Sequence, residues 1–295
     1  MANRRVIVKR RKAVRNIRKI TRTMRLIATA RFQTAYNRAT AGKPYSEKLG
    51  EMVADLARAS EGLDHPLLSE PEAAGRSDLV VITSSRGLAG GYNAGVLRAA
   101  IAHLDAQAEA GIETRTTMVR KKGIAYFRFL SRPMAETLTA LSDMPRFEEV
   151  LPIAEALMER FVSGASASAH VAYMRFDSTS RQRPEVVRLL PLSREAGSGE
   201  AGAAKAPGRT VQYEFSPEPR QLLDELLPAT VRLKLYQAFT DAAVSEQIAR
   251  MVAMKQATGA AEEKIKLLTR QYNRARQTAI TMELLDIVGG ANALA

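Results

Sequence analysis

The chain has 295 residues and a net charge of +13, a length sufficient for one or two domains with a buried core. It contains no cysteine, which excludes structural disulfides, thiolate metal sites and thiol switches and indicates a reducing compartment. No run of ~18 or more apolar residues without a charge occurs, so we expect neither a signal segment nor a transmembrane segment.

The first predicted element is a long helix over residues 4–41, a stretch with neither glycine nor proline. An apolar row at helical spacing is formed by Ile17, Ile20, Met24 and Ile27. A row of arginines lies nearly opposite, at ~100° per residue, and consists of Arg11, Arg15, Arg18, Arg22 and Arg25. We therefore predict that the isoleucine face packs and that the arginine face presents charge.

The basic excess belongs to this segment. Residues 1–46 carry fourteen lysines and arginines and no acidic residue, so the rest of the chain is close to neutral. Three interpretations remain: a solvated helix face, a surface that neutralises phosphates of a nucleic acid, and an Arg-rich transit peptide. The helix continues into further apolar positions, which argues against the peptide, and the lack of interleaved aromatic residues argues against base stacking.

Gly42 and Pro44 are expected to end the first helix, and a separate helix is expected over 47–59, followed by a loop over 62–77. A buried strand at 79–83 then leads through a glycine-rich turn into a helix at 96–108. The turn contains neither G-x-x-x-x-G-K-[ST] nor G-x-G-x-x-G, so a tight strand-to-helix connection explains it better than a nucleotide site.

Alternating strands and helices follow, which indicates a small α/β domain. Strands are predicted at 114–119, 170–176, 185–192 and 210–215, and helices at 123–131 and 151–163. A flexible surface loop is predicted at 193–208. The histidines at 65, 103 and 170 have no ligand spacing and no catalytic set of residues occurs, so we expect no cofactor, no metal and no catalytic residue.

The last predicted element is a helix over about 230–288, with no proline and a single glycine before Gly289. Sixty helical residues would extend roughly 90 Å, which favours a coiled coil. A seam with alternating three- and four-residue steps consists of Ile265, Leu268, Tyr272, Ala275, Ala279 and Met282. A second apolar row of Ile280, Leu284 and Ile287 lies on another face. The helix therefore either meets two partners, one of them outside this chain, or lies in an ordinary core.

This layout resembles the γ subunit of F-type ATP synthases, and three regions carry the resemblance. The first is residues 15–24 (RNIRKITRTM) with 27–30 (IATA), and the second is the turn 85–93 (SRGLAGGYN), similar to D-R-G-L-C-G-G-x-N. The third comprises 245–255 (SEQIARMVAMK), 272–277 (YNRARQ), 280–284 (ITMEL) and 287–291 (IVGGA). Ser85 and Ala89 depart from the motif. The dense arginines suggest an alternative or divergent form of the complex.

The resemblance implies a Rossmann-like α/β insert domain with a mostly parallel sheet, plus a long antiparallel two-helix coiled coil formed by the terminal helices. It implies an N-terminal shaft helix over 1–60, the α/β domain over 61–215 and a C-terminal shaft helix over 216–295. The chain would be a non-catalytic rotor that couples rotation of the c-ring to the catalytic β subunits, on the cytoplasmic face of a bacterial inner membrane.

The implied partners are the α and β subunits, the ε subunit and the c-ring, without nucleic acid. Contacts to the β subunit are implied for Met24, Arg25, Arg276, Gln277, Thr281 and Glu283. An apolar bearing is implied for Ile280, Leu284 and Ile287. The alternative function is a coiled-coil protein that binds nucleic acid through its basic first helix.

Overall fold

The computed structural model describes residues 4–59, 65–69, 75–192 and 219–294. The elements in chain order are α1 (Arg4–Ala59), β1 (Arg76–Ile82), α2 (Tyr92–Glu109), β2 (Glu113–Val119), α3 (Lys121–Phe129), β3 (Glu136–Leu138), α4 (Phe147–Val162), β4 (Ser168–Phe176), β5 (Gln182–Leu190) and α5 (Pro219–Leu294). They form two compact units. Unit 1 comprises residues 1–30 and 250–295, and unit 2 comprises residues 31–249.

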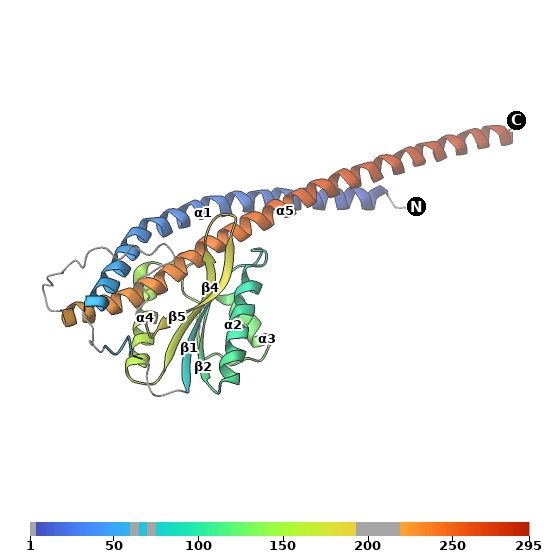
Figure 1. The fold of residues 1–295 in the computed structure, drawn as a ribbon. Coiled ribbons are helices and arrows are strands. Elements are labelled where there is room, and N and C mark those ends of the chain that lie inside the picture. Colours follow the sequence, from blue (N-terminus) through green and yellow to red (C-terminus); the bar gives the residue numbers. More distant parts are fainter. Residues whose placement is uncertain (1–3, 60–64, 70–74, 193–218, 295) are drawn as a thin grey trace. The chain divides into compact units, whose positions relative to one another are not determined.

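Unit 2 is built on one five-stranded sheet with the order β3-β2-β1-β4-β5. Figure 1 labels β1, β2, β4 and β5 of this sheet. β1 pairs in parallel with β2 and β4, and β2 pairs in parallel with β3. Only β5 is antiparallel to its neighbour, β4. The predicted α/β domain with a mostly parallel sheet is therefore confirmed.

Both faces of the sheet are covered, because successive residues of a strand point to opposite sides. Leu79 and Val81 face a core shared with α2 and α3. Val80 and Ile82 face a larger core shared with α4, with α5 up to Ala242 and with Leu56 of α1. This burial on both sides explains why β1 reads as a continuous apolar run.

The predicted strands and shorter helices of unit 2 are found with small shifts of their ends, apart from those outside the described residues. These are the strand at 210–215 and the loop at 193–208. By contrast, α5 begins at Pro219 rather than near residue 230 and continues through Pro228. The sequence did not reveal β3, which has only three residues at the sheet edge and no apolar run. Pro219 begins α5, where the missing N–H of proline is tolerated.

The predicted break at Gly42 and Pro44 is wrong, because α1 continues through both residues to Ala59. Proline removes one backbone hydrogen bond inside a helix. Packing on both sides offsets this cost: Ala35 and Ala39 are buried before the proline, and Leu49 is buried after it. The predicted helix at 47–59 is thus the end of α1.

Unit 1 is an antiparallel pair formed by the start of α1 and the second half of α5. The hydroxyl of Thr258 donates a 2.9 Å hydrogen bond to that of Thr21, and both side chains are buried. The guanidinium of Arg11 lies 4.8 Å from the ring centre of Tyr272, a cation–π distance. The predicted coiled coil is confirmed, and its α5 seam is buried or half-buried from Ile265 to Ala279, whereas Met282 is 44% exposed.

The predicted packing face of α1 is wrong. Ile17, Ile20 and Ile27 are 50%, 58% and 51% exposed, whereas Arg11, Arg18 and Arg25 are half-buried. Burial instead follows a seven-residue repeat through Ile7, Val14, Thr21, Ala28, Ala35, Gly42, Leu49 and Leu56. Small residues on this repeat let the helices approach closely, and arginine stems can pack there while their charged heads reach water.

Candidate functional site

The end of α5 in unit 1 is a single helix with exposed apolar side chains. Every side chain described from Ile280 to Asn292 is exposed. The predicted bearing residues Ile280, Leu284 and Ile287 are 48%, 57% and 68% exposed. Leu285 and Val288, at 59% and 56%, extend this surface and were not predicted. Exposed side chains of this kind on adjacent turns indicate a partner surface.

The six predicted β-subunit contacts fall into two separate places. Arg276, Gln277, Thr281 and Glu283 are exposed on neighbouring turns of α5, and the Thr281 hydroxyl donates to the Gln277 carbonyl at 3.0 Å. Met24 and Arg25 are half-buried on α1, near the Thr21–Thr258 contact. Eighteen residues of α5 separate Thr258 from Arg276, roughly 27 Å along the helix. The two groups cannot therefore form one site.

The charge of unit 1 is one-sided. Residues 4–30 and 250–292 contain eighteen lysines and arginines but only four acidic residues. The exposed isoleucine row of α1 lies within this basic surface. Unit 1 thus offers apolar side chains surrounded by positive charge, which suits a partner with acidic groups beside an apolar surface.

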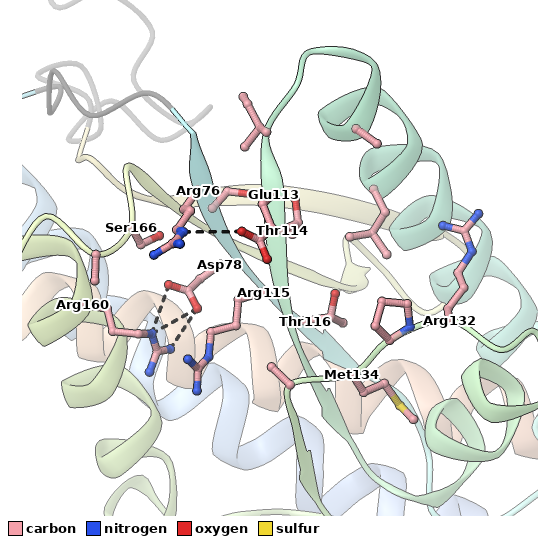
Figure 2. A pocket seen from close by; sticks show the side chains of 17 residues that line it. Arg76, Asp78, Glu113, Thr114, Arg115, Thr116, Arg132, Met134, Arg160 and Ser166 are labelled. Atoms are coloured by element: carbon pink, nitrogen blue, oxygen red, sulfur yellow. Dashed lines mark hydrogen bonds and ion pairs between the residues drawn. The ribbon is translucent and has the colours of Figure 1, made fainter.

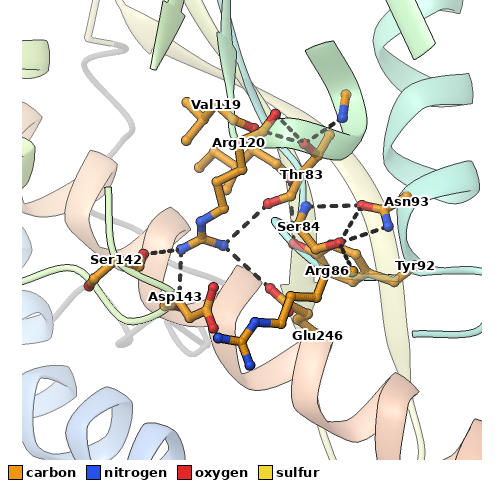
Figure 3. A network of polar contacts seen from close by, with 12 residues as sticks. Thr83, Ser84, Arg86, Tyr92, Asn93, Val119, Arg120, Ser142, Asp143 and Glu246 are labelled. Carbon is orange, nitrogen blue, oxygen red and sulfur yellow. Dashed lines mark hydrogen bonds and ion pairs between the residues drawn. The ribbon is translucent and has the colours of Figure 1, made fainter. Parts of the chain in front are cut away.

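In unit 2, the glycine-rich turn joins β1 to α2 and is held by its own polar groups. The backbone N–H of Ser84 donates to Asn93 Oδ1 at 3.0 Å, and Asn93 Nδ2 donates to Ser84 Oγ at 2.8 Å (Figure 3). Leu88 and Gly90 have positive φ values of 63° and 55°, which let the chain turn sharply. These contacts agree with the predicted tight connection between strand and helix.

Unit 2 contains a buried arginine, Arg120, that no pattern in the sequence predicted. The side chain of Arg120 is 0% exposed, and its guanidinium donates to the carbonyls of Thr83, Ser142 and Asp143 at 3.2, 2.8 and 2.9 Å (Figure 3). It also pairs at 3.4 Å with Glu246 of α5, whose side chain is 1% exposed. Arg120 therefore ties the ends of β1 and β2 to α5.

The backbone of Arg120 is strained. Its φ of 72° and ψ of 162° lie in a region that is essentially restricted to glycine. Such strain persists only where surrounding contacts fix the conformation. The four polar contacts of the guanidinium supply that constraint.

Two histidines that looked scattered in the sequence meet between α2 and β4. The rings of His103 and His170 lie 4.5 Å apart, centre to centre. Burial, together with the charges of His103 and Arg188, lowers the pKa of His170 to about 4. Burial also lowers the pKa of His103, so both rings are held neutral near pH 7.

Asp241 of α5 shows the opposite effect on a carboxyl group. Burial raises its pKa to about 6, and hydrogen bonds from Gln237 and the Phe176 backbone oppose the rise only in part. Within the described residues, histidine, aspartate and glutamate side chains form no group of three or more that could hold a metal ion. None of the described helices is both long and apolar enough to cross a membrane.

The chain is similar to known proteins over nearly its whole length. The family model described as ATP synthase matches residues 3–294. A protein named ATP synthase gamma chain from Rhodopirellula baltica is 40% identical over 294 residues, which cover 100% of this chain and 99% of the relative. Another of that name from Frankia casuarinae is 41% identical over 288 residues, 96% of this chain and 95% of the relative.

Two solved structures show the same fold. A chain of the Euglena gracilis mitochondrial ATP synthase, described as OSCP/F1/c-ring in rotational state 3, matches with a TM-score of 0.64 and 17% identity. The match covers 99% of this chain and 94% of that one. A chain from the central stalk and c-ring of the Tetrahymena thermophila enzyme matches with a TM-score of 0.57 and 20% identity, over 81% of this chain and 99% of that one.

Proposed function

The chain belongs to the ATP synthase gamma-chain family, and from this premise we propose that it is the central rotor shaft of an F-type ATP synthase. Relatives about 40% identical over the whole chain carry this conclusion. The chain would turn with the c-ring and force the catalytic β subunits through different affinities for nucleotide. It would catalyse no reaction itself.

We infer that the exposed end of α5 turns inside the ring of α and β subunits. Apolar contacts are non-directional, so the surface of Ile280, Leu284 and Ile287 can slide against an apolar bearing without a strongly preferred angle. Polar contacts to a β-subunit loop would come from the exposed Arg276, Gln277, Thr281 and Glu283. A separate contact to the β subunit would come from Met24 and Arg25. The one-sided charge of unit 1 suits acidic groups on the β subunits.

Binding to nucleic acid is not supported by any of these observations. That alternative relied on an arginine face turned to solvent. Of that row, Arg11, Arg18 and Arg25 are instead half-buried along the helix pair, with Arg11 over the ring of Tyr272, and only Arg15 and Arg22 are exposed. The relatives point to an assembly of proteins, in which the α, β and ε subunits and the c-ring would be the partners. The assembly would hold the chain at the cytoplasmic face of a bacterial inner membrane.

The test is reconstitution with purified α and β subunits from the same organism. We expect this chain to join a large complex and to increase its MgATP hydrolysis, while the chain alone hydrolyses none. A truncation after Gln271 should lose the increase. Failure to assemble under conditions in which another gamma chain assembles would refute the proposal.

A sharper variant replaces Ile280, Leu284 and Ile287 with aspartate. Because these side chains are exposed in the isolated chain, its thermal stability should not change. Coupled ATP hydrolysis should nevertheless fall, because charge is placed on an apolar bearing. The matched control is Thr278→Asp, an exposed position on the same part of α5 that is not in the apolar row. Equal loss in the control would show that the apolar row has no special role.

A further inference from the structure

A pocket of about 610 Å³ opens in unit 2 where β1 and β2 begin, but its lining does not form one ligand site (Figure 2). Asp78 faces α4, where it pairs with Arg160 at 3.1 Å, and Arg115 lies directly across from Asp78 on the same face of the sheet. Leu104, which also lines the pocket, packs on the opposite face. β2 therefore lies between the charged and the apolar residues of this pocket.

Polar atoms without partners lie instead between α2 and β4, around the contact of His103 with His170. Within the described residues, three buried side-chain atoms here have no hydrogen-bond partner, namely Nε2 of His103, Nδ1 of His170 and Oε1 of Gln107. Leaving one buried polar atom unpaired costs about 1–3 kcal/mol, and native proteins contain few such atoms. Three of them between the same two elements indicate that ordered water or an ion binds there.

All three side chains face the same space. His103 and Gln107 are four residues apart on α2, so they lie on one face of that helix. This face also carries Ala100, which is buried against the sheet. His170 lies directly across from Leu79 in the pairing of β1 with β4, and Leu79 packs against α2. His170 therefore points from the sheet toward the helix face that carries His103 and Gln107.

The three unpaired atoms also lie at a similar depth. Nε2 is at the far end of the His103 ring and Oε1 is at the end of the Gln107 side chain, so both reach from α2 toward the sheet. Nδ1 is at the near end of the His170 ring, so on a side chain from β4 it lies close to the sheet as well. The atoms are buried while all three residues are half-buried, so water has access to the rings.

The spacing of the rings fits one metal ion. A Zn–N bond is about 2.1 Å long and a ring nitrogen lies about 1.2 Å from its ring centre, so two imidazoles on one tetrahedral ion have centres roughly 5 Å apart. The rings of His103 and His170 lie 4.5 Å apart, centre to centre. Small rotations of the two side chains close this difference.

The chemistry of the three atoms suits a transition metal. Burial is the main cause that lowers the pKa of both histidines, so each imidazole is neutral near pH 7, the form that binds metal. Imidazole nitrogens are ligands of Zn²⁺, Cu²⁺ and Ni²⁺. One charge opposes a cation: Arg188 of β5 lies across from His170, but its side chain is exposed and water screens it.

We propose that Nε2 of His103, Nδ1 of His170 and Oε1 of Gln107 bind one divalent transition-metal ion such as Zn²⁺, with water in the remaining position. The site goes beyond the rotor function and does not depend on it. Spacing along the chain did not indicate it, because the ligands come from a helix and a strand. The ion would tie α2 to β4 and stabilise unit 2, since it binds the folded chain only.

The test is calorimetric titration of the full chain, without a histidine tag and in a buffer that does not bind metals, with Zn²⁺, Cu²⁺ and Mg²⁺. We expect one Zn²⁺ per chain, tighter binding of Cu²⁺ and no binding of Mg²⁺, which prefers oxygen ligands. Saturating Zn²⁺ should raise the melting temperature. Electron paramagnetic resonance of the Cu²⁺ complex should show coupling to two imidazole nitrogens.

Substitutions assign the ligands. His103→Gln and His170→Gln should each weaken Zn²⁺ binding by about tenfold or more, at least the loss seen when an outer-shell partner is removed. The chain has three histidines, so the matched control is His65→Gln, which removes the remaining imidazole and should leave the affinity unchanged. Gln107→Glu places a carboxylate at the third position and should tighten binding by about tenfold, a gain that misfolding cannot produce.

Three results would overturn the proposal. They are the absence of saturable one-to-one Zn²⁺ binding, an affinity that survives both His103→Gln and His170→Gln, and no gain in affinity from Gln107→Glu. Ordered water would then be the partner of the unpaired atoms. None of these results bears on assembly with the α and β subunits, which is measured separately.

Discussion

Replacing Arg120 separates the strain of its backbone from the interactions of its side chain. Arg120→Ala removes a fully buried guanidinium from its contacts with Glu246 and three carbonyl oxygens. Deleting one member of a buried ion pair costs about 3–5 kcal/mol. We therefore expect Arg120→Ala to lower the free energy of unfolding of unit 2 by this amount.

Arg120→Gly should be less harmful than Arg120→Ala. Glycine adopts the φ of 72° and ψ of 162° without the ~1–3 kcal/mol of strain that other residues store there. Its greater freedom in the unfolded chain offsets about 0.4–1 kcal/mol of this gain. The glycine variant should therefore be more stable than the alanine variant by about 1 kcal/mol, the reverse of the usual order.

A double-mutant cycle measures the ion pair itself. Glu246→Gln keeps the size of the side chain and removes its charge, so Arg120→Ala should cost less in that background than in the natural chain. Urea unfolding followed by circular dichroism gives the free energies. Hydrogen exchange of β1, β2 and residues 240–249 assigns the loss to unit 2, with residues 255–270 of α5 as the internal control.

Two results would refute this reasoning. If Arg120→Gly is no more stable than Arg120→Ala, the backbone of Arg120 stores no strain. If the two substitutions add without coupling, the 3.4 Å contact between Arg120 and Glu246 contributes nothing to stability. The second result would leave the carbonyl hydrogen bonds as the interactions that stabilise this buried arginine.

Three further predictions concern unit 2. Gly123→Ala should lower the free energy of unfolding by about 1–3 kcal/mol through overpacking, because a Cβ there would lie 2.7 Å from Thr83 Cγ2. The control is Gly91→Ala, whose new Cβ would have nothing within 4 Å and should leave the thermal melt unchanged. The natural chain should lose stability as pH rises through about 6, because folded Asp241 keeps its proton up to that pH whereas the unfolded chain releases it near 3.8. Asp241→Asn should remove this loss, and an unchanged dependence of stability on pH would contradict the prediction. The natural chain should also lose stability as pH falls from about 6.5 to about 4, because in this range His170 binds a proton only in the unfolded state. His170→Gln should remove this loss, which is measured by comparing thermal melts at pH 5 and pH 8.

The sequence alone determined the long helices and most strands, because their signals are local. The α5 seam from Ile265 to Ala279 repeats every three or four residues, and this spacing appears in the burial of the same residues. β1 was readable as an apolar run because both of its faces are covered. β3 carries no such signal, since three residues at an edge need no apolar pattern.

Which face of α1 packs was decided by the tertiary structure. The sequence offers an isoleucine row and a seven-residue repeat from Ile7 to Leu56, and only the partner helix selects between them. It selects the repeat with small residues, which permits close approach, and leaves Ile17, Ile20 and Ile27 exposed. The same packing carries α1 through Pro44, where a local rule predicted an end.

The clusters of polar residues also came from tertiary structure. Arg120 and Glu246 are 126 residues apart in the chain, and His103 and His170 are brought together from a helix and a strand. Arg160 of α4 holds the carboxylate of Asp78, although Arg115 of β2 lies directly across from Asp78 in the sheet. Spacing along a sequence reports neighbours on one helix or strand, whereas these contacts depend on which elements the fold places side by side.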